Sequence, residues 1–262
     1  MKKLCLAFVI GAFGVAINAQ GTMYVVDSSR AISSVNLATG AKTLLGTVSA
    51  NAGTTAGLAW DNSNGVMYLT SSGNDSVYSL DLATFNATLI GAYGDAAVVM
   101  HGLEYDDSTG TLYGVSQHNN GLYNINKTTG AATLIGTSGL GSFSNLGYNS
   151  DTDTMYSTNS GTDSFYTMNR ATGAVTLIGA LGGPTNPNAL AYNPDNGLLY
   201  LADNSTDNLY TINTATGAAT VIGSMGSGNI LGMAYVPVPE PGTMAVLGLG
   251  ALALLRRKKK TA

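Results

Sequence analysis

The chain has 262 residues, and its 15 acidic residues outnumber its 11 lysines and arginines, which gives a formal net charge of −4. The bases are concentrated at the two ends, so the body between residues 20 and 237 carries four of them against thirteen aspartates and one glutamate. This balance excludes nucleic acid as a partner, because such an interface needs clustered bases to neutralise phosphates.

The first 19 residues are typical of a secretory signal peptide. Lys2 and Lys3 precede an apolar run from Leu4 to Ala16, and Ile17–Ala19 supplies a small residue before a cleavage point. A short buried helix is the alternative interpretation. The single cysteine, Cys5, lies within this segment. We therefore expect a mature chain that has neither disulfides nor thiolate metal ligands.

One segment is repeated five times along the body, as a turn followed by a strand that closes on glycine. The closing glycines are 45, 45, 43 and 44 residues apart. A period of this length with several short strands per repeat is typical of a β-propeller blade. The copies are NLATGAKTLLG at Asn36–Gly46, DLATFNATLIG at Asp81–Gly91, NKTTGAATLIG at Asn126–Gly136, NRATGAVTLIG at Asn169–Gly179 and NTATGAATVIG at Asn213–Gly223.

Each repeat contains four strand-like parts. The first is apolar and aromatic, as in GLAWD at Gly57–Asp61, and a turn rich in Asp, Asn, Ser and Gly follows it. The second centres on a Met-Tyr or Leu-Tyr pair, the third alternates as in LYTIN at Leu209–Asn213, and the fourth ends on the repeated glycine. Period-two alternation in short segments joined by turn residues predicts antiparallel sheet throughout.

The incomplete copies at the two ends predict how the fold closes. The copy that begins near Thr22 lacks a first strand, and the last copy has a first strand alone, at Gly232–Val236. Together they make one complete blade. We therefore expect an all-β fold over residues 20–237, a five-bladed β-propeller of four-stranded antiparallel blades, closed by pairing the C-terminal strand with the N-terminal strands. A linear solenoid is the alternative, but it needs capping repeats that the sequence does not show.

Aromatic residues recur at fixed positions of the repeat. Thirteen of the fourteen tyrosines follow this rule. A platform for stacking sugars is one interpretation. We favour packing, in which large rings fill the wedge between neighbouring blades and the phenol reaches a backbone partner. The position at the end of the first strand, called the aromatic slot below, is filled by Trp60, Tyr105, Tyr148, Tyr192 and Tyr235.

Candidate site residues come from positions where the repeats disagree, because loops on a rigid ring are free to vary. Asp27 and Asp203 are the only acids at the end of the second strand, and ring closure makes them neighbours. His101 occupies a position held elsewhere by Ala, Ser, Asn or Leu. Glu104 replaces Ala or Gly on the innermost strand. We expect these departures to share one face of the ring.

The functional hypothesis is an acidic pocket at the channel mouth. Asp27 and Asp203 would hold a cation there, with His101 beside it. Glu104 would be a buried acid whose pKa is raised by desolvation. The alternative is structural: the aspartates stabilise turns, His101 caps a loop and Glu104 bonds a neighbouring backbone group.

No nucleophile-elbow, zincin or P-loop motif occurs in the body. The aspartate-rich turns at Asp106-Asp107 and Asp151–Asp153 lack the spacing of an EF-hand loop. We therefore expect no resident cofactor, and weak Ca²⁺ binding at these turns is the alternative to purely solvated hairpins.

The composition changes abruptly over residues 238–262. Pro239, Glu240 and Pro241 precede an apolar stretch at Met244–Leu255 and a basic cluster at Arg256–Lys260. Twelve apolar residues span about 18 Å as a helix, less than the roughly 30 Å hydrocarbon core, so transient membrane insertion is favoured over a permanent transmembrane helix. Bases after the apolar run place that end on the cytoplasmic side.

These three parts, in this order, resemble the PEP-CTERM sorting signal of Gram-negative bacteria. The resemblance covers about the last 25 residues and implies recognition by an exosortase-type membrane protease. It also implies passage through the inner membrane and delivery to the cell surface or extracellular matrix. The body is more loosely similar to other exported bacterial propellers.

We therefore expect an exported β-propeller that acts as a non-catalytic binding or structural module. Extracellular polysaccharide or another surface protein is the expected partner. A secreted hydrolase or lyase that uses the acidic site is the alternative, and a ring that merely displays its loops as a spacer is a third interpretation.

Overall fold

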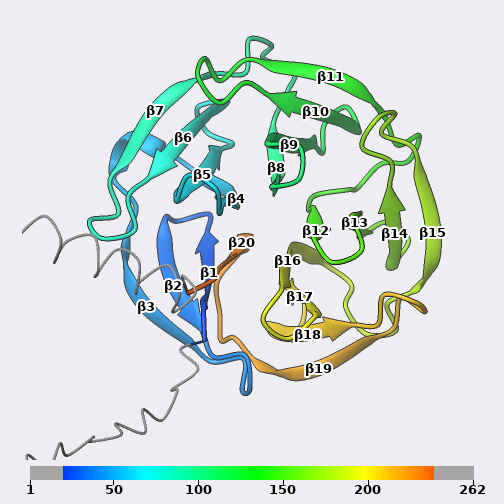
Figure 1. Ribbon diagram of the computed structural model, residues 1–262. Helices are drawn as coiled ribbons and strands as arrows, with labels where there is room; N and C mark the ends of the chain where they lie inside the picture. Colours follow the sequence, from blue (N-terminus) through cyan, green and yellow to red (C-terminus); the bar gives the residue numbers. More distant parts are fainter. Residues whose placement is uncertain (1–19, 239–262) are drawn as a thin grey trace, which may run out of the picture.

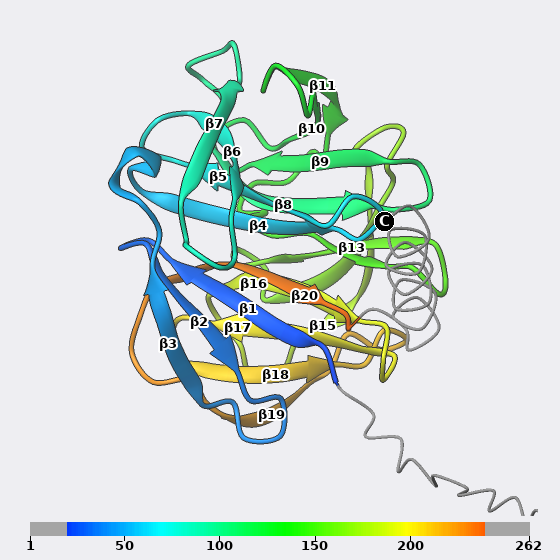
Figure 2. The ribbon, with the colours of Figure 1, turned by 60° about the vertical axis from the view of Figure 1, so that its left-hand side comes forward.

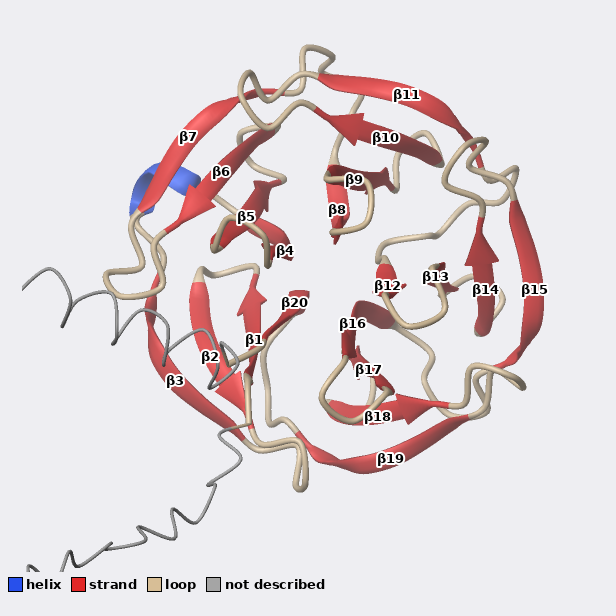
Figure 3. Ribbon diagram, in the orientation of Figure 1, coloured by secondary structure: helices blue, strands red, loops and turns tan. Residues whose placement is uncertain are grey.

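Residues 20–238, the part of the chain that the computed structural model describes, form five four-stranded antiparallel sheets around a central axis (Figure 1). Each blade runs from an innermost strand beside the axis to an outermost strand on the circumference (Figure 3). The predicted five-bladed propeller is therefore confirmed. One 3-10 turn, η1 (Ala50–Ala52), lies between the first and second blades.

The blades are numbered here by their position in the ring, and their strands follow the repeat. From the axis outward, blade 1 contains β20 (Ile230–Val236), β1 (Thr22–Asp27), β2 (Ala31–Val35) and β3 (Lys42–Thr47); blade 2 contains β4 (Thr55–Asp61), β5 (Val66–Ser71), β6 (Ser76–Leu80) and β7 (Ala87–Ala92); blade 3 contains β8 (Met100–Asp106), β9 (Thr111–Ser116), β10 (Gly121–Ile125) and β11 (Ala132–Thr137); blade 4 contains β12 (Gly147–Asn149), β13 (Thr154–Asn159), β14 (Ser164–Met168) and β15 (Val175–Ala180); blade 5 contains β16 (Pro187–Asn193), β17 (Leu198–Asp203), β18 (Asn208–Ile212) and β19 (Ala219–Ser224).

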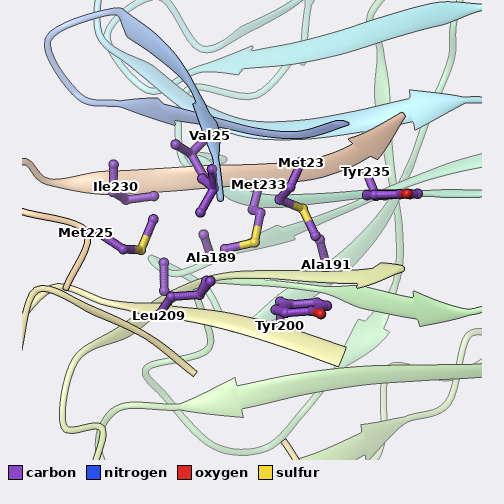
Figure 4. Close-up of a cluster of buried hydrophobic side chains, with 12 residues drawn as sticks. Met23, Val25, Ala189, Ala191, Tyr200, Leu209, Met225, Ile230, Met233 and Tyr235 are labelled. Carbon is purple, nitrogen blue, oxygen red and sulfur yellow. The ribbon is translucent and has the colours of Figure 1, made fainter. Parts of the chain in front are cut away.

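The ring closes within blade 1, as the incomplete repeats predict. Strand β20 pairs antiparallel with β1, with Thr22 opposite Val236 and Met23 opposite Tyr235. Apolar side chains from blades 1 and 5 then seal the joint: Figure 4 shows Met233 beside Met23 and Ala189 in one buried cluster. The same type of cluster fills every other interface between blades.

Strand β12 is shorter than its counterparts, although NLGYN at Asn145–Asn149 is the sequence equivalent of GLAWD at Gly57–Asp61. The side chain of Asn145 takes over ladder bonds in this region. Asn145 Oδ1 accepts the backbone N–H of Thr158 at 3.0 Å, and the backbone carbonyl of Asn145 accepts the side-chain hydroxyl of Ser157 at 2.6 Å. The strand therefore starts at Gly147.

Alternating strand directions give the ring two different faces (Figure 2). One, the link face, carries the links between blades and the turns after each second strand. The other, the mouth face, carries the turns after each first and third strand. Because Thr22 lies opposite Val236, the described chain both enters and leaves the ring on the mouth face.

No helix among residues 20–238 has the length and apolar character needed to cross a membrane. The predicted signal peptide, the motif Pro239–Pro241 and the apolar stretch Met244–Leu255 lie outside the described residues.

Candidate functional site

A cavity of about 310 Å³ opens on the mouth face. All five residues of the aromatic slot line it, so the repeat places one ring per blade around a single opening. Glu104 lies among them, where four repeats have Ala or Gly. The remaining lining residues are Asn62, Asp107, Ser150, Ala191, Pro194, Ala234 and Pro237.

The channel narrows sharply beyond this cavity. Where the innermost strands approach most closely, the remaining space is about 10 Å³, no more than one water molecule occupies. Glycines permit the close approach: a Cβ on Gly232 would lie 2.4 Å from the carbonyl oxygen of Ala56. The cavity is therefore a blind pocket that is separated from the link face.

The slot tyrosines are buried between blades, and their phenols bond carboxylates. The hydroxyls of Tyr148 and Tyr192 donate to Asp153 Oδ1 at 2.6 Å and to Asp151 Oδ2 at 2.7 Å. Burial, together with these carboxylates, raises the pKa of both phenols to about 12. The packing role expected from the sequence is present, but the partner of the phenol is a turn carboxylate rather than a backbone group.

Glu104 lies in the cavity wall, on β8. Its Oε1 accepts the N–H of Tyr105 at 2.9 Å, and its Oε2 reaches the next blade and accepts the N–H of Tyr148 at 3.0 Å. Burial raises its pKa to about 8, the charges of Asp107 and Asp106 add to that shift, and the two N–H bonds oppose it. Glu104 is therefore mostly protonated at neutral pH.

Asp107 is the second acid at the opening. It lies on the exposed rim, in the turn that follows β8. The hydroxyl of Ser63 donates to its Oδ1 at 3.4 Å. Desolvation raises its pKa, and the nearby charge of Asp61 adds to the effect. Among the described residues that line the cavity, none is basic.

Two ion pairs between blades support the wall from behind. Arg170 of blade 4 pairs with the fully buried carboxylate of Asp106 in blade 3. Lys127 of blade 3 lies 3.8 Å from the buried Asp61 of blade 2. Each base also lies over a slot tyrosine, with Arg170 5.1 Å and Lys127 4.7 Å from the ring centres.

These pairs are not evident from the sequence alone. A signal was present, because Lys127 and Arg170 are half of the bases in the body and both occupy the position that Leu37 and Leu82 fill in other repeats. Pairing them with particular acids needs the arrangement of the blades.

Asp27 and Asp203 lie on the link face, at the ends of β1 and β17 in the adjacent blades 1 and 5. Each carboxylate bonds its own turn. Asp27 Oδ1 accepts the N–H groups of Ser29 and Ala31, both at 2.9 Å. Asp203 Oδ2 accepts the N–H and the hydroxyl of Thr206 at 2.9 and 2.8 Å. These contacts match the structural alternative for the two aspartates.

His101 is half-buried on β8 of blade 3, which borders neither blade 1 nor blade 5. Burial lowers its pKa, a bond with Gln117 opposes that shift and the nearby His118 adds to it. Glu104 follows three residues later, about 10 Å further along the strand, and lines the cavity on the mouth face. The structure therefore does not gather the four candidate residues into one site.

Within residues 20–238 no three His, Asp or Glu side chains cluster closely enough to form a metal site. The expectation of weak Ca²⁺ binding stays a prediction.

Two protein families match this sequence. The PEP-CTERM protein-sorting motif matches residues 237–260. A family described as a repeat of unknown function, DUF6923, matches residues 102–237, more than half of the chain. This chain belongs to the DUF6923 repeat family. With its PEP-CTERM motif, this DUF6923 protein is exported and sorted at the membrane, and the motif implies processing by exosortase.

No curated protein matches the DUF6923 chain significantly. Similar solved structures include the nidogen/laminin complex, at 17% identity over 83% of this chain and 81% of the other, with a TM-score of 0.60. A symmetrical protein studied for its de novo evolutionary emergence aligns at 20% identity over 84% and 100%, with a TM-score of 0.55. Virginiamycin B lyase from Staphylococcus aureus aligns at 15% identity over 86% and 72%, with a TM-score of 0.50. Likeness at this level shows the propeller fold.

Proposed function

We propose that this exported propeller is a binding module that holds a saccharide unit of an extracellular polysaccharide in the cavity on its mouth face. The observation that carries the proposal is the convergence of five slot aromatics on one blind pocket of about 310 Å³. That volume is at the lower end of the range for small-ligand sites, about 300–1,000 Å³. Aromatic walls with a few polar groups suit a ring that has both apolar and hydroxyl-bearing faces.

The position of the chain end supports a role at the cell surface. Pro237 lines the rim of the cavity, and the Pro-Glu-Pro segment begins two residues later at Pro239. The described part of the chain therefore ends at the mouth face. We propose that this face is turned toward the membrane while the tail is inserted, and that processing frees the ring for the cell surface or matrix.

Trp60 allows a direct test, because it is the single tryptophan of the chain and lines the cavity. Its fluorescence is followed while the full-length chain is titrated with a panel of oligosaccharides. We expect a saturable change with at least one of them, and its loss in Ser150→Phe, which adds bulk at the exposed rim. Asp95→Asn, on an exposed loop of the link face, serves as the control that keeps the response. A panel that gives no response by fluorescence or calorimetry refutes the proposal.

A second function has one observation in its favour. Glu104 is an acid whose pKa is raised to about 8, and a protonated carboxyl in a pocket is the form that a general acid needs. A hydrolase or lyase of polysaccharide would use it to protonate a leaving group. Turnover by the parent chain that disappears in Glu104→Gln supports this alternative, and binding without turnover supports the binding module.

A further inference from the structure

Backbone N–H groups form a second set of donors around the cavity. Along an innermost strand, N–H groups alternate between the second strand and the open channel. Tyr105 and Tyr148 direct theirs into the channel, where Glu104 accepts both. Trp60, Tyr192 and Tyr235 occupy the same register, each opposite the equivalent residue of its second strand.

The N–H groups of these three slot residues therefore also face the channel. The residues that precede them are Ala59, Ala191 and Ala234, whose side chains have no acceptor to offer. Three donors therefore face the channel, and within residues 20–238 no side chain accepts them as Glu104 accepts the N–H groups of Tyr105 and Tyr148. A ligand with several oxygen atoms would satisfy them.

The acidic residues of the cavity favour a ligand that carries a positive charge. Glu104 and Asp107 line the opening, and Asp106, between them in the sequence, is buried. The slot residues of the other innermost strands are uncharged. Arg170 pairs with Asp106 and Asp153 and lies over the ring of Tyr148. A positively charged group in the cavity would be attracted by the aromatic faces as well as by the carboxylates.

We infer that the saccharide bound at the mouth is an amino sugar with a protonated amine, held at its ammonium group by Glu104 and Asp107. Its hydroxyl oxygens accept the three open N–H groups. This inference rests on the proposed saccharide-binding function and narrows it to one class of ligand. A metal ion or a simple amine would leave the N–H donors unsatisfied, and a neutral sugar would bring no positive charge to Glu104 and Asp107.

The same arrangement determines how the protonation of Glu104 changes when the ligand binds. Glu104 is mostly protonated in the empty cavity at pH 7, because burial raises its pKa. An ammonium group beside it favours the carboxylate, so binding releases the carboxyl proton to the buffer while the ligand keeps its own charge.

Three oligosaccharides of equal length test the inference by calorimetry on the full-length chain: a β-1,4-glucosamine oligomer, its N-acetylated form and the corresponding glucose oligomer. They differ in whether each sugar carries a free amine, an acetylated amine or no amine. We expect the glucosamine oligomer to bind at least about tenfold more tightly than the other two, the size of one charge-assisted hydrogen bond. Its heat should depend on the buffer, which reports proton release.

Glu104→Gln should remove most of this preference and the proton release. Asp107→Asn, at the exposed rim, should reduce the preference without affecting the fold. Asp95→Asn removes the same charge on the link face and should change nothing.

Equal binding of the three oligomers refutes the amino-sugar inference and leaves the saccharide site intact. A preference that survives both Glu104→Gln and Asp107→Asn refutes it as well. Failure of all three to bind, together with failure of the wider oligosaccharide panel, refutes the proposed function itself.

Discussion

Replacing Arg170 with leucine is expected to destabilise the ring through the buried acid that it leaves behind. The Asp106 side chain is 0% exposed, and Arg170, 20% exposed, is its partner across the interface between blades 3 and 4. Removing one partner of a buried ion pair costs about 3–5 kcal/mol, because the remaining charge stays desolvated.

The lower end of that range applies here. Asp106 keeps hydrogen bonds from Ser108 and Thr109, which hold part of its charge. The loss of Arg170 from the face of Tyr148 adds about 0.5–1 kcal/mol. We expect a total of about 3.5–4 kcal/mol. In a domain of this size that corresponds to a fall in Tm of roughly 7–16 °C.

Urea unfolding and thermal melts of Arg170→Leu measure this cost, and the repeat supplies a matched rescue. Asn149 and Asn193 occupy the position of Asp106 in other blades, and Asn149 Oδ1 accepts turn N–H groups at 2.9 and 3.2 Å. Adding Asp106→Asn to Arg170→Leu should therefore keep the turn, remove the buried charge and recover about 2 kcal/mol. A loss below about 0.5 kcal/mol in the single variant, or no recovery in the double variant, refutes the argument.

Three further predictions follow from the same geometry. Because burial raises the pKa of Glu104 to about 8, the folded chain prefers the protonated acid. This contribution to stability is complete below about pH 4 and is lost as the pH rises through 8. Between pH 4 and pH 9 the free energy of unfolding, measured by urea titration, should therefore fall by roughly 3–5 kcal/mol less in Glu104→Gln than in the parent. Parallel pH profiles would contradict this. Deleting Ile230–Val236 opens blade 1 and should abolish the cooperative thermal transition, whereas a truncated chain that melts like the parent would show that closure does not matter. Asp203→Ala removes the acceptors of one turn on the link face and should cost about 1–2 kcal/mol without changing the saccharide titration; an altered titration would place that face in the site.

The repeat by itself determined the architecture. Five copies at a spacing near 44 residues require five equivalent units, and the missing first strand near Thr22 is supplied by Gly232–Val236. These inferences succeed because strand alternation and turn chemistry are local, so each repeat carries its own instructions. The sorting tail is equally local, since its three parts are read in order along the chain.

The location of the site was decided by the tertiary structure. Asp27, Asp203 and His101 share the link face, whereas Glu104 opens onto the mouth face, beyond a constriction that no single repeat reveals. The repeats showed that Glu104 is unusual, but its pKa near 8 depends on Tyr148 of the next blade and on how deeply the strand end is buried. Arg170 and Asp106 are 64 residues apart. They pair because the curvature of the ring brings the turn after the third strand of one blade against the end of the first strand of its neighbour. Sequence specifies each blade, but the properties of the pocket arise where five blades meet, and that meeting is a consequence of closure around the axis.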